Sequence, residues 1–475
     1  MTASAHKFYN EILAKFPYKA TNKQRELLNL LVNFIFSDNK NALFILKGFA
    51  GTGKTTSVGA VVSNLWRVKK KFILLAPTGR AAKVISGYSG KQALTIHKKI
   101  YFPKVQKNGS LRFVMQVNKH TDTVFLVDEA SMISDEQQST KLFENGSLLN
   151  DLISYVYSGK NCKLIFIGDT AQLPPVKLSL SPALEADKLS ARFDKEVIQI
   201  ELNQVVRQHE YSGILNNATA LRSLIQNRAT DFKFSVNFDD IKRLQDSYEI
   251  QDAIADAFQD DTGVEESAVI VYSNKRANLY NKQIRVKIKG RENEICAGDY
   301  IMVVKNNYFW LKETPSAGFI ANGDICKVLQ INAIKELYGF RFAEAKIMMI
   351  DYPDIKAFNT VLLLNTLMSE SPSLSYEESD RLYKAVREDF AHEKSKYKQL
   401  LGIRNNKYFN ALQVKFSYAM TCHKSQGGQW KRIFVEQPYL PEGPTINYLR
   451  WLYTAITRAE DKLYLIGFED SYFLD

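Results

Sequence analysis

The segment NALFILKGFAGTGKTT, residues 41–56, constrains the fold more than any other part of the chain. Its apolar run predicts a buried strand, and a helix is expected to start where the glycine-rich loop ends. The loop matches G-x-x-x-x-G-K-[ST], a pattern in which backbone N–H groups and a helix N-terminus bind phosphate groups. The segment therefore predicts a nucleoside triphosphate site at the edge of a sheet.

Individual residues of this loop have separate expected roles. Lys54 would reach the β- and γ-phosphates, and the Thr55 hydroxyl would bind Mg²⁺. ATP and Mg²⁺ are therefore the expected cofactors. The remaining loop residues expected at the nucleotide are Gly48, Gly51, Thr52, Gly53 and Thr56.

Three further apolar segments, KFILLAPT, DTVFLVDEA and KLIFIGDT, are each followed by a polar cluster. Apolar strands that alternate with helices favour a parallel sheet covered on both faces, with ligands at the carboxyl ends of the strands. At these ends, Asp128 is expected to hold Mg²⁺, and Glu129 to act as the general base that orients the attacking water. Gln172 is expected to contact the γ-phosphate.

Length and charge narrow the class of protein. The chain has 475 residues and a formal net charge of +12, which predicts about three folding units and a polyanionic partner such as nucleic acid. It contains no apolar run long enough for a membrane helix and no signal-peptide core. Its four scattered cysteines favour a reducing, cytoplasmic setting without a zinc site.

The order of patterns predicts two α/β domains of the parallel-sheet type, residues 1–205 and 206–475. The first carries an inserted β-hairpin within 98–121, because Asn108-Gly109 stands between two alternating runs. The second is interrupted at about 296–405 by short strands with turn signals and then by charged helical sequence. We expect this insert to be a β-barrel-like unit with a helical extension.

Two arginines are candidates for stabilising the charge that develops during phosphoryl transfer. Arg207 lies in ELNQVVRQ and Arg458 in YTAITRAEDKL, both within the second predicted domain. They could serve the nucleotide only if this domain closes on the first, which would couple hydrolysis to domain motion.

The ordered set of motifs resembles the superfamily 1 helicases, specifically the RecD-like branch, superfamily 1B, that includes the phage helicase Dda. The resemblance covers nearly the whole chain and implies two RecA-like domains, the second with a UvrD-like C-terminal part. The motifs that carry it are KGFAGTGKTT, APTGRAAKVIS, TIHK, VDEASM, GDTAQLPPV, ELNQVVRQ, YAMTCHKSQGGQW and YTAITRAEDKLYL.

The resemblance also implies roles for individual residues. Gln24 would recognise adenine, and Arg207 and Arg458 match the two arginine fingers. The hairpin matches a strand-separating pin, and the inserted barrel matches a Src-homology-3-like domain. Phe102 and Phe113 flank the hairpin tip and, on physical grounds, could meet the first base pair. The residues implied to contact the strand are Pro77, Thr78, Lys83, Thr95, His97, Thr421, His423, Ser425 and Gly427. Gly79 stands where some relatives have histidine.

Together these features predict a monomeric, ATP-dependent 5′-3′ DNA helicase that acts on single-stranded DNA and at junctions of single- and double-stranded DNA. A single-strand-binding protein is a candidate partner, and no membrane contact is expected. The alternatives are an RNA helicase, and a strand-stimulated translocase or ATPase that does not unwind alone. A P-loop kinase or switch would leave the later motifs unexplained, and a non-enzymatic binding module would not need the intact Lys54, Asp128 and Glu129.

Overall fold

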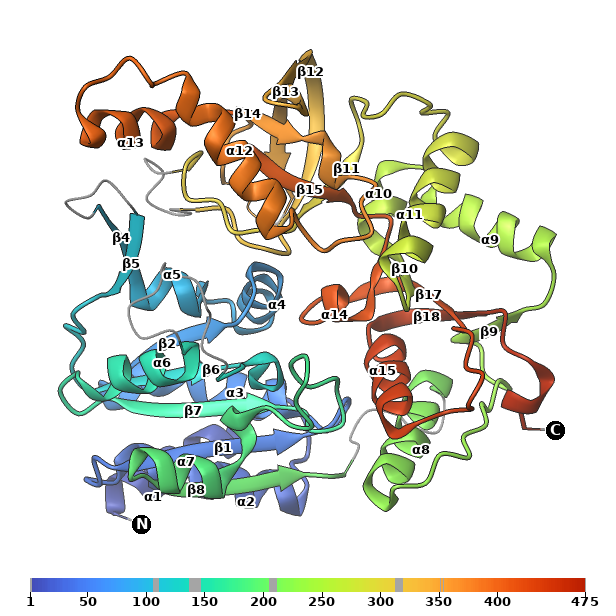
Figure 1. Ribbon diagram of the computed structural model, residues 1–475. Coiled ribbons are helices and arrows are strands. Elements are labelled where there is room, and N and C mark those ends of the chain that lie inside the picture. Colours follow the sequence, from blue (N-terminus) through green and yellow to red (C-terminus); the bar gives the residue numbers. More distant parts are fainter. Residues whose placement is uncertain are drawn as a thin grey trace.

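The computed structural model describes residues 2–105, 111–135, 147–204, 212–311, 319–350, 352 and 354–474. Two parallel sheets and a closed β-barrel make up most of it (Figure 1). The six-stranded first sheet has the order β3-β2-β6-β7-β1-β8, and every neighbouring pair is parallel. Its strands are β1 (Ala42–Gly48), β2 (Lys71–Ala76), β3 (Ala93–Thr95), β6 (Thr123–Val127), β7 (Lys163–Gly168) and β8 (Glu196–Leu202).

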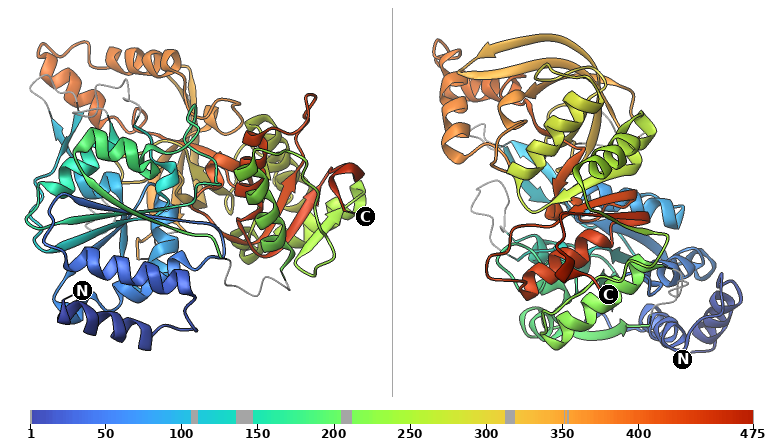
Figure 2. Two further views of the ribbon diagram at one scale, coloured as in Figure 1. Left: turned by 90° about the horizontal axis from the view of Figure 1, so that it is seen from below. Right: turned by 90° about the vertical axis from the view of Figure 1, so that its right-hand side faces the viewer.

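Helices cover both faces of the first sheet (Figure 2), as the continuous apolar strands predicted. Alternate residues of β1 point to opposite faces. Phe44 and Leu46 join a core cluster with α1, α2 and α3, whereas Leu43 and Ile45 join another with α5, α6 and α7. The first-sheet helices are α1 (Ala3–Ala14), α2 (Asn22–Phe36), α3 (Lys54–Val62), α4 (Gly79–Ser89), α5 (Ile96–Ile100), α6 (Leu148–Tyr157) and α7 (Ala186–Phe193).

The five-stranded second sheet lies beside the first and is also parallel, with the order β16-β10-β17-β18-β9. Its strands are β9 (Ile241–Leu244), β10 (Ser267–Val271), β16 (Ala419–Thr421), β17 (Trp430–Glu436) and β18 (Ala459–Ile466). The helices associated with it are α8 (Gly213–Asn227), α9 (Ser247–Phe258), α10 (Asp261–Glu266), α11 (Asn274–Gln283), α14 (Cys422–Ser425) and α15 (Ile446–Ile456). The expected pair of RecA-like parallel-sheet units is therefore present.

A closed five-stranded barrel is inserted between β10 and β16 of the second sheet. Its strands are β11 (Tyr300–Val303), β12 (Ile325–Leu337), β13 (Phe340–Met349), β14 (Phe358–Leu363) and β15 (Leu412–Phe416). The last of these lies beyond 405, where the sequence placed the end of the insert. The barrel closes only because β15 pairs with both β11 and β14, and strand pairing across more than a hundred residues leaves no local sequence signal.

A buried ion-pair cluster fixes the entry of the chain into this barrel. Asp299 is fully buried, and its carboxylate accepts hydrogen bonds from Arg285 Nε and Nη2 at 3.0 and 2.9 Å. Arg291 donates to the same carboxylate at 3.3 Å, and the Tyr418 hydroxyl at 3.1 Å. Because a buried charge is costly without partners, this cluster fastens the barrel to the second sheet.

The hairpin and the helical extension also form. Strands β4 (Tyr101–Val105) and β5 (Leu111–Met115) pair antiparallel, and the expected Asn108-Gly109 turn lies outside the described residues. Helices α12 (Tyr376–Glu388) and α13 (Lys396–Asn405) pack on the barrel through Leu382, Val386 and Ile403. They lie on the same side of the molecule as the hairpin (Figure 2).

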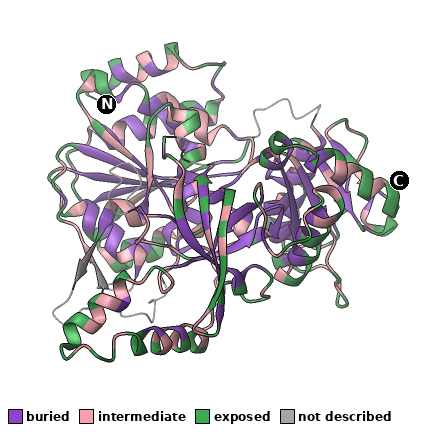
Figure 3. Ribbon diagram, turned by 90° about the horizontal axis from the view of Figure 1, so that it is seen from above, coloured by how far each residue is buried: buried purple, intermediate pink, exposed green. Residues whose placement is uncertain are grey.

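Burial is concentrated in the strands of the two sheets and the barrel, while α12 and α13 remain largely exposed on one side (Figure 3). Within the described residues, no helix combines the length and apolar character that crossing a membrane would require.

The barrel contacts the first sheet at the start of α4. A Cβ atom added to Gly79 would lie 2.2 Å from Asp324 Oδ1 and 2.9 Å from the Tyr352 hydroxyl. Asp324 is fully buried, and its Oδ2 accepts a hydrogen bond from the Ala321 N–H at 2.7 Å, so it cannot simply turn away. Glycine, which has no Cβ, lets the barrel approach α4 this closely.

We therefore predict opposite effects for two glycines of α4. Gly79→Ala should lower the temperature of thermal unfolding, because overpacking costs ~1–3 kcal/mol. Gly87→Ala is the matched control: nothing lies within 4 Å of the added Cβ, and alanine gains ~0.5–1 kcal/mol over glycine inside a helix. If Gly79→Ala unfolds at or above the wild-type temperature, the barrel is not seated on α4 as described.

Candidate active site

The glycine-rich loop joins β1 to α3, which begins at Lys54. Gly51 and Gly53 have φ values of 74° and 80°, a left-handed conformation that glycine adopts without strain. The Lys54 ammonium donates hydrogen bonds to the carbonyl oxygens of Gly48 at 2.6 Å and Phe49 at 2.8 Å. The lysine thus lies across its own loop, where an entering phosphate would offer it a stronger, charged acceptor.

Gln24 lies against this loop from the start of α2. Its carboxamide oxygen accepts the Thr21 N–H at 3.0 Å, which completes the helix cap predicted at Thr21. Its amide group donates to the Thr52 carbonyl at 3.4 Å. Thr52 is buried, and its hydroxyl donates to Phe49 O at 2.8 Å. Gln24 and Thr52 therefore stabilise the conformation of the loop. Thr56 follows Thr55 in the first turn of α3.

The two predicted acids follow β6 directly. Asp128 and Glu129 are half-buried, and Asp128 Oδ1 accepts the Glu129 N–H at 2.8 Å. Glu129 has a φ of 51°, a conformation uncommon for a residue with a side chain and found most often at functional sites. Desolvation raises the pKa of both carboxyls, opposed at Asp128 by the Glu129 N–H and the charge of Lys54, and at Glu129 chiefly by the charge of Arg458.

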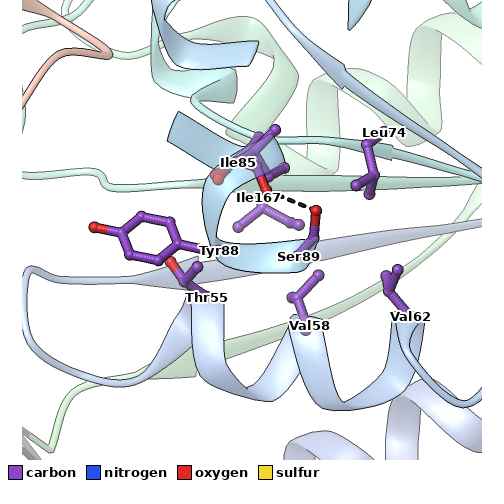
Figure 4. A pocket seen from close by; sticks show the side chains of 10 residues that line it. Thr55, Val58, Val62, Leu74, Ile85, Tyr88, Ser89 and Ile167 are labelled. Atoms are coloured by element: carbon purple, nitrogen blue, oxygen red, sulfur yellow. Dashed lines mark hydrogen bonds between the residues drawn. The ribbon is translucent and has the colours of Figure 1, made fainter. Parts of the chain in front are cut away.

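Thr55 and Asp128 line one pocket, as a pair of oxygen donors for Mg²⁺ must. Figure 4 shows this pocket between α3 and α4, where Val58, Ile85 and Tyr88 supply much of its wall. Most of the lining is apolar, and the Ser89 hydroxyl is turned to the Ile85 carbonyl at 2.7 Å. Among the residues that line this pocket, Thr55 supplies a hydroxyl and Asp128 a carboxylate, both of which suit a hard cation.

Gln172 and Arg458 reach this site from two different parts of the fold. Gln172 is buried, and its side-chain oxygen has no hydrogen-bond partner among the described residues, which suits a group that gains one when a ligand enters. Arg458 follows α15 of the second sheet and is 4% exposed. Its guanidinium donates to Thr454 O at 3.0 Å and Gly428 O at 3.3 Å, yet its charge lowers the pKa of Glu129 on the first sheet. Arg207 lies outside the described residues.

Helix α15 makes further contacts with the first sheet that sequence reasoning missed. The Tyr453 hydroxyl accepts the Ala50 N–H of the glycine-rich loop at 2.9 Å and donates to Asp169 Oδ2 at 2.6 Å. The Thr454 hydroxyl accepts the Leu173 N–H at 2.8 Å. Their only sequence signal is proximity to Arg458, because contacts between distant segments do not appear in local patterns.

Two more side chains attach the second sheet to the loop that carries Gln172. Arg450 donates to the Thr170 carbonyl, and Gln426 donates to the Leu173 carbonyl at 2.8 Å. Both ends of the nucleotide site, the phosphate loop and the loop after β7, are therefore held by the second sheet.

Several residues implied to contact a strand cap helices in this structure. The Thr78 hydroxyl accepts the Ala81 N–H at the start of α4, and the buried Thr95 hydroxyl accepts the Lys98 N–H at the start of α5, both at 3.2 Å. Thr421 occupies the equivalent position before α14 but makes no side-chain cap bond. Its hydroxyl is therefore left for another partner.

Motifs from the two sheets meet at α4. Gly427 has a φ of 74°, and an added Cβ would lie 2.7 Å from the Ala81 Cβ. The Arg80 guanidinium lies over the Trp430 ring at 3.8 Å, a cation–π contact that the sequence did not suggest. The regions after β2 and β16, predicted separately as strand contacts, thus form one continuous surface.

The remaining predicted contacts differ in exposure. His423 and Lys83 are exposed and Pro77 is half-buried, whereas Ser425 is fully buried and donates to Cys422 O at 2.8 Å. Desolvation lowers the pKa of His97 to about 4, so its imidazole is neutral near pH 7.

Of the two hairpin phenylalanines, the structure describes the side chain of Phe102 but not that of Phe113. Phe102 is 42% exposed, as a group that meets a base pair must be. The Phe113 side chain lies outside the described residues.

Comparison with known proteins assigns the family. A family model described as an AAA domain matches residues 21–233, and one described as the UvrD-like helicase C-terminal domain matches residues 416–466. The ATP-dependent DNA helicase dda of Enterobacteria phage T4 is 23% identical over 478 residues, covering 94% of this chain and 99% of that protein. The ATP-dependent RecD2 DNA helicase of Deinococcus radiodurans is 30% identical over 180 residues, covering 38% of this chain and 21% of that protein.

These matches support a superfamily 1B DNA helicase of the RecD-like type. The two family models match separate parts of the chain, neither of them over half of it, and the Dda alignment covers 94% of the chain. A solved structure of Pif1 helicase from Bacteroides, in complex with ADP-AlF3 and ssDNA, has a TM-score of 0.47 at 15% identity and covers 96% of this chain and 94% of that chain. The family models and the helicase relatives indicate an ATP-hydrolysing enzyme.

Replacing Lys54 should separate hydrolysis from strand binding in this helicase. Lys54→Ala removes the cation that faces the phosphates, and loss of one such group costs at least ~100-fold in kcat. Binding of a labelled single-stranded oligonucleotide should change little. Lys47→Ala is the control, because Lys47 lies on β1 and its ammonium bonds Gln199 at 2.9 Å instead of the loop. Loss of strand binding together with hydrolysis would contradict the assignment of Lys54 to the nucleotide alone.

Proposed function

We propose that the protein is an ATP-dependent 5′-3′ DNA helicase that translocates on single-stranded DNA and separates the duplex at the β4–β5 hairpin. The observation that carries the proposal is the contact of two sheets at the nucleotide site: Tyr453 of the second sheet bonds Ala50 in the glycine-rich loop at 2.9 Å and Asp169 of the first sheet at 2.6 Å. A site built this way changes when ATP is bound and hydrolysed, and the change moves one sheet against the other.

In the proposed reaction Glu129 orients the attacking water and accepts its proton, and Gln172 contacts the γ-phosphate. Lys54, Arg458 and Arg207 stabilise the charge that builds on the transferred phosphoryl group. Mg²⁺, held by Thr55 and Asp128, would neutralise phosphate charge when bound. Gln24 is proposed to recognise the adenine, and the loop glycines with Thr52 and Thr56 to bind the phosphates.

The proposed strand path follows the surface where α4, α5, α14 and the barrel come together. Close packing of Gly427 on Ala81 and of Gly79 on Asp324 supports a single path across both sheets and the barrel. The net charge of +12 suits a polyanion, and both named relatives are described as DNA helicases. The Thr421 hydroxyl, which makes no cap bond at the start of α14, suits a phosphate contact that does not depend on base sequence.

The proposal also includes the direction of movement, the domain boundaries and the oligomeric state. Gln172 is followed by Leu-Pro-Pro-Val, as in RecD, which supports 5′-3′ movement. The domains are proposed to divide at 205/206, between β8 of the first sheet and α8 of the second-sheet part. We also propose a monomer with a single-strand-binding protein as a candidate partner. A reducing, cytoplasmic setting is proposed because the four cysteines are scattered along the chain.

The choice between DNA and RNA is tested by ATP hydrolysis. Single-stranded DNA should raise kcat above the basal rate, and an RNA oligonucleotide of the same sequence should raise it much less. Steady-state phosphate release at equal salt concentration gives both values, because contacts with phosphates weaken as salt rises. Equal or greater stimulation by RNA would favour the alternative, an RNA helicase of superfamily 1.

The pin is tested by shortening the turn around Asn108-Gly109, which lies outside the described residues. The shortened variant should retain DNA-stimulated ATP hydrolysis but lose strand displacement, because the hairpin is proposed to act on the duplex and not on the nucleotide. Unwinding at the wild-type rate would show that another element separates the strands.

A further inference from the structure

We propose that Tyr453 is a positioning residue for ATP hydrolysis: its hydroxyl joins the phosphate-binding loop to Asp169 and thereby sets the place of Arg458. The inference deepens the proposed function, since it rests on the roles given above to Glu129 and Arg458. It concerns two residues, Tyr453 and Asp169, that have no role in the reaction as described so far.

The Tyr453 hydroxyl is held by two bonds that cross between the sheets. It accepts the Ala50 N–H at 2.9 Å and donates to Asp169 Oδ2 at 2.6 Å. Ala50 lies in the glycine-rich loop two residues after Gly48, and Asp169 begins the loop that leads to Gln172. One hydroxyl on α15 therefore contacts both loops that are proposed to face the phosphates.

Both partners are fixed, so the hydroxyl has little freedom. Tyr453 is 1% exposed and Asp169 2% exposed. The other oxygen of Asp169 accepts the Ala171 N–H at 2.9 Å, which holds the carboxylate in one orientation. If the buried hydroxyl loses either bond, a polar group is left unsatisfied, which costs free energy. The two bonds are therefore expected to form or break together.

Arg458 lies five residues beyond Tyr453, just past the end of α15. Its guanidinium is turned back onto Thr454 O at 3.0 Å, so the side chain is carried by the end of this helix. A second bond, from Arg458 Nη1 to the Gly428 carbonyl at 3.3 Å, holds the side chain to the same part of the fold. Docking α15 through Tyr453 thus sets the position of the arginine relative to the phosphate-binding loop.

The test replaces only the hydroxyl. Tyr453→Phe should lower kcat for ATP hydrolysis about tenfold or more while KM for ATP changes less than about twofold, because the interaction serves the transition state and not ground-state binding. Tyr448→Phe is the matched control: Tyr448 lies on the same helix, is also buried, and bonds Gln437 within the second-sheet part of the chain. Its kcat should stay close to that of the wild type.

A double variant separates positioning from general loss of packing. If Tyr453 acts through Arg458, Tyr453→Phe should slow an Arg458→Ala enzyme no further, whereas independent effects would multiply. Multiplied effects, a change in KM alone, or equal kcat for Tyr453→Phe and Tyr448→Phe would each overturn the inference. If Tyr453→Phe does not fold, Asp169→Asn, which keeps the size of the partner, is put through the same measurements.

Turnover is measured without DNA and with saturating single-stranded DNA, so that two failures are told apart. If DNA does not raise the kcat of the wild type but Tyr453→Phe still lowers the basal kcat, the result contradicts the proposed strand motor and supports the inference. A DNA-stimulated wild type with an unaffected Tyr453→Phe variant would leave the motor intact and overturn the inference.

Discussion

The arrangement of this structure depends on two adjacent carboxyl groups, Asp128 and Glu129, whose negative charges need nearby cations. Desolvation raises the pKa of both, and cations from two directions oppose it: Lys54 from the glycine-rich loop and Arg458 from the second sheet. Since neither sheet carries both cations, the acids are best compensated when the two sheets are together. In the proposed mechanism, the relative position of the two sheets would therefore couple hydrolysis at these acids to movement.

The barrel extends this coupling to the strand. It is fixed to the second sheet through the buried carboxylate of Asp299 and seated on the first sheet at Gly79. A movement between the sheets must therefore change the contact between barrel and α4, on the proposed strand path. Glycines at 79 and 427 matter here because backbone approaches neighbouring side chains where a Cβ would not fit.

Local features of the fold were predictable and long-range ones were not. The strand before Gly48, the helix cap at Thr21, the two parallel sheets and the β4–β5 hairpin follow from short patterns of apolar, capping and turn residues. Closure of the barrel by β15, the stacking of Arg80 on Trp430 and the bonds of Tyr453 join segments far apart in the chain. No short sequence pattern predicts such contacts. The carboxylates and the loop of the nucleotide site could therefore be predicted from the sequence, whereas the side chains that join the sheets could not.

The measurement that tests this account most directly is ATP-driven strand displacement on two duplexes, one with a 5′ single-stranded tail and one with a 3′ tail. The account predicts unwinding from the 5′ tail alone, dependent on hydrolysis. Unwinding from the 3′ tail alone would keep a motor but contradict the direction drawn from the residues after Gln172. Unwinding of neither duplex would contradict the central claim that closure of the two sheets on ATP drives DNA strands apart.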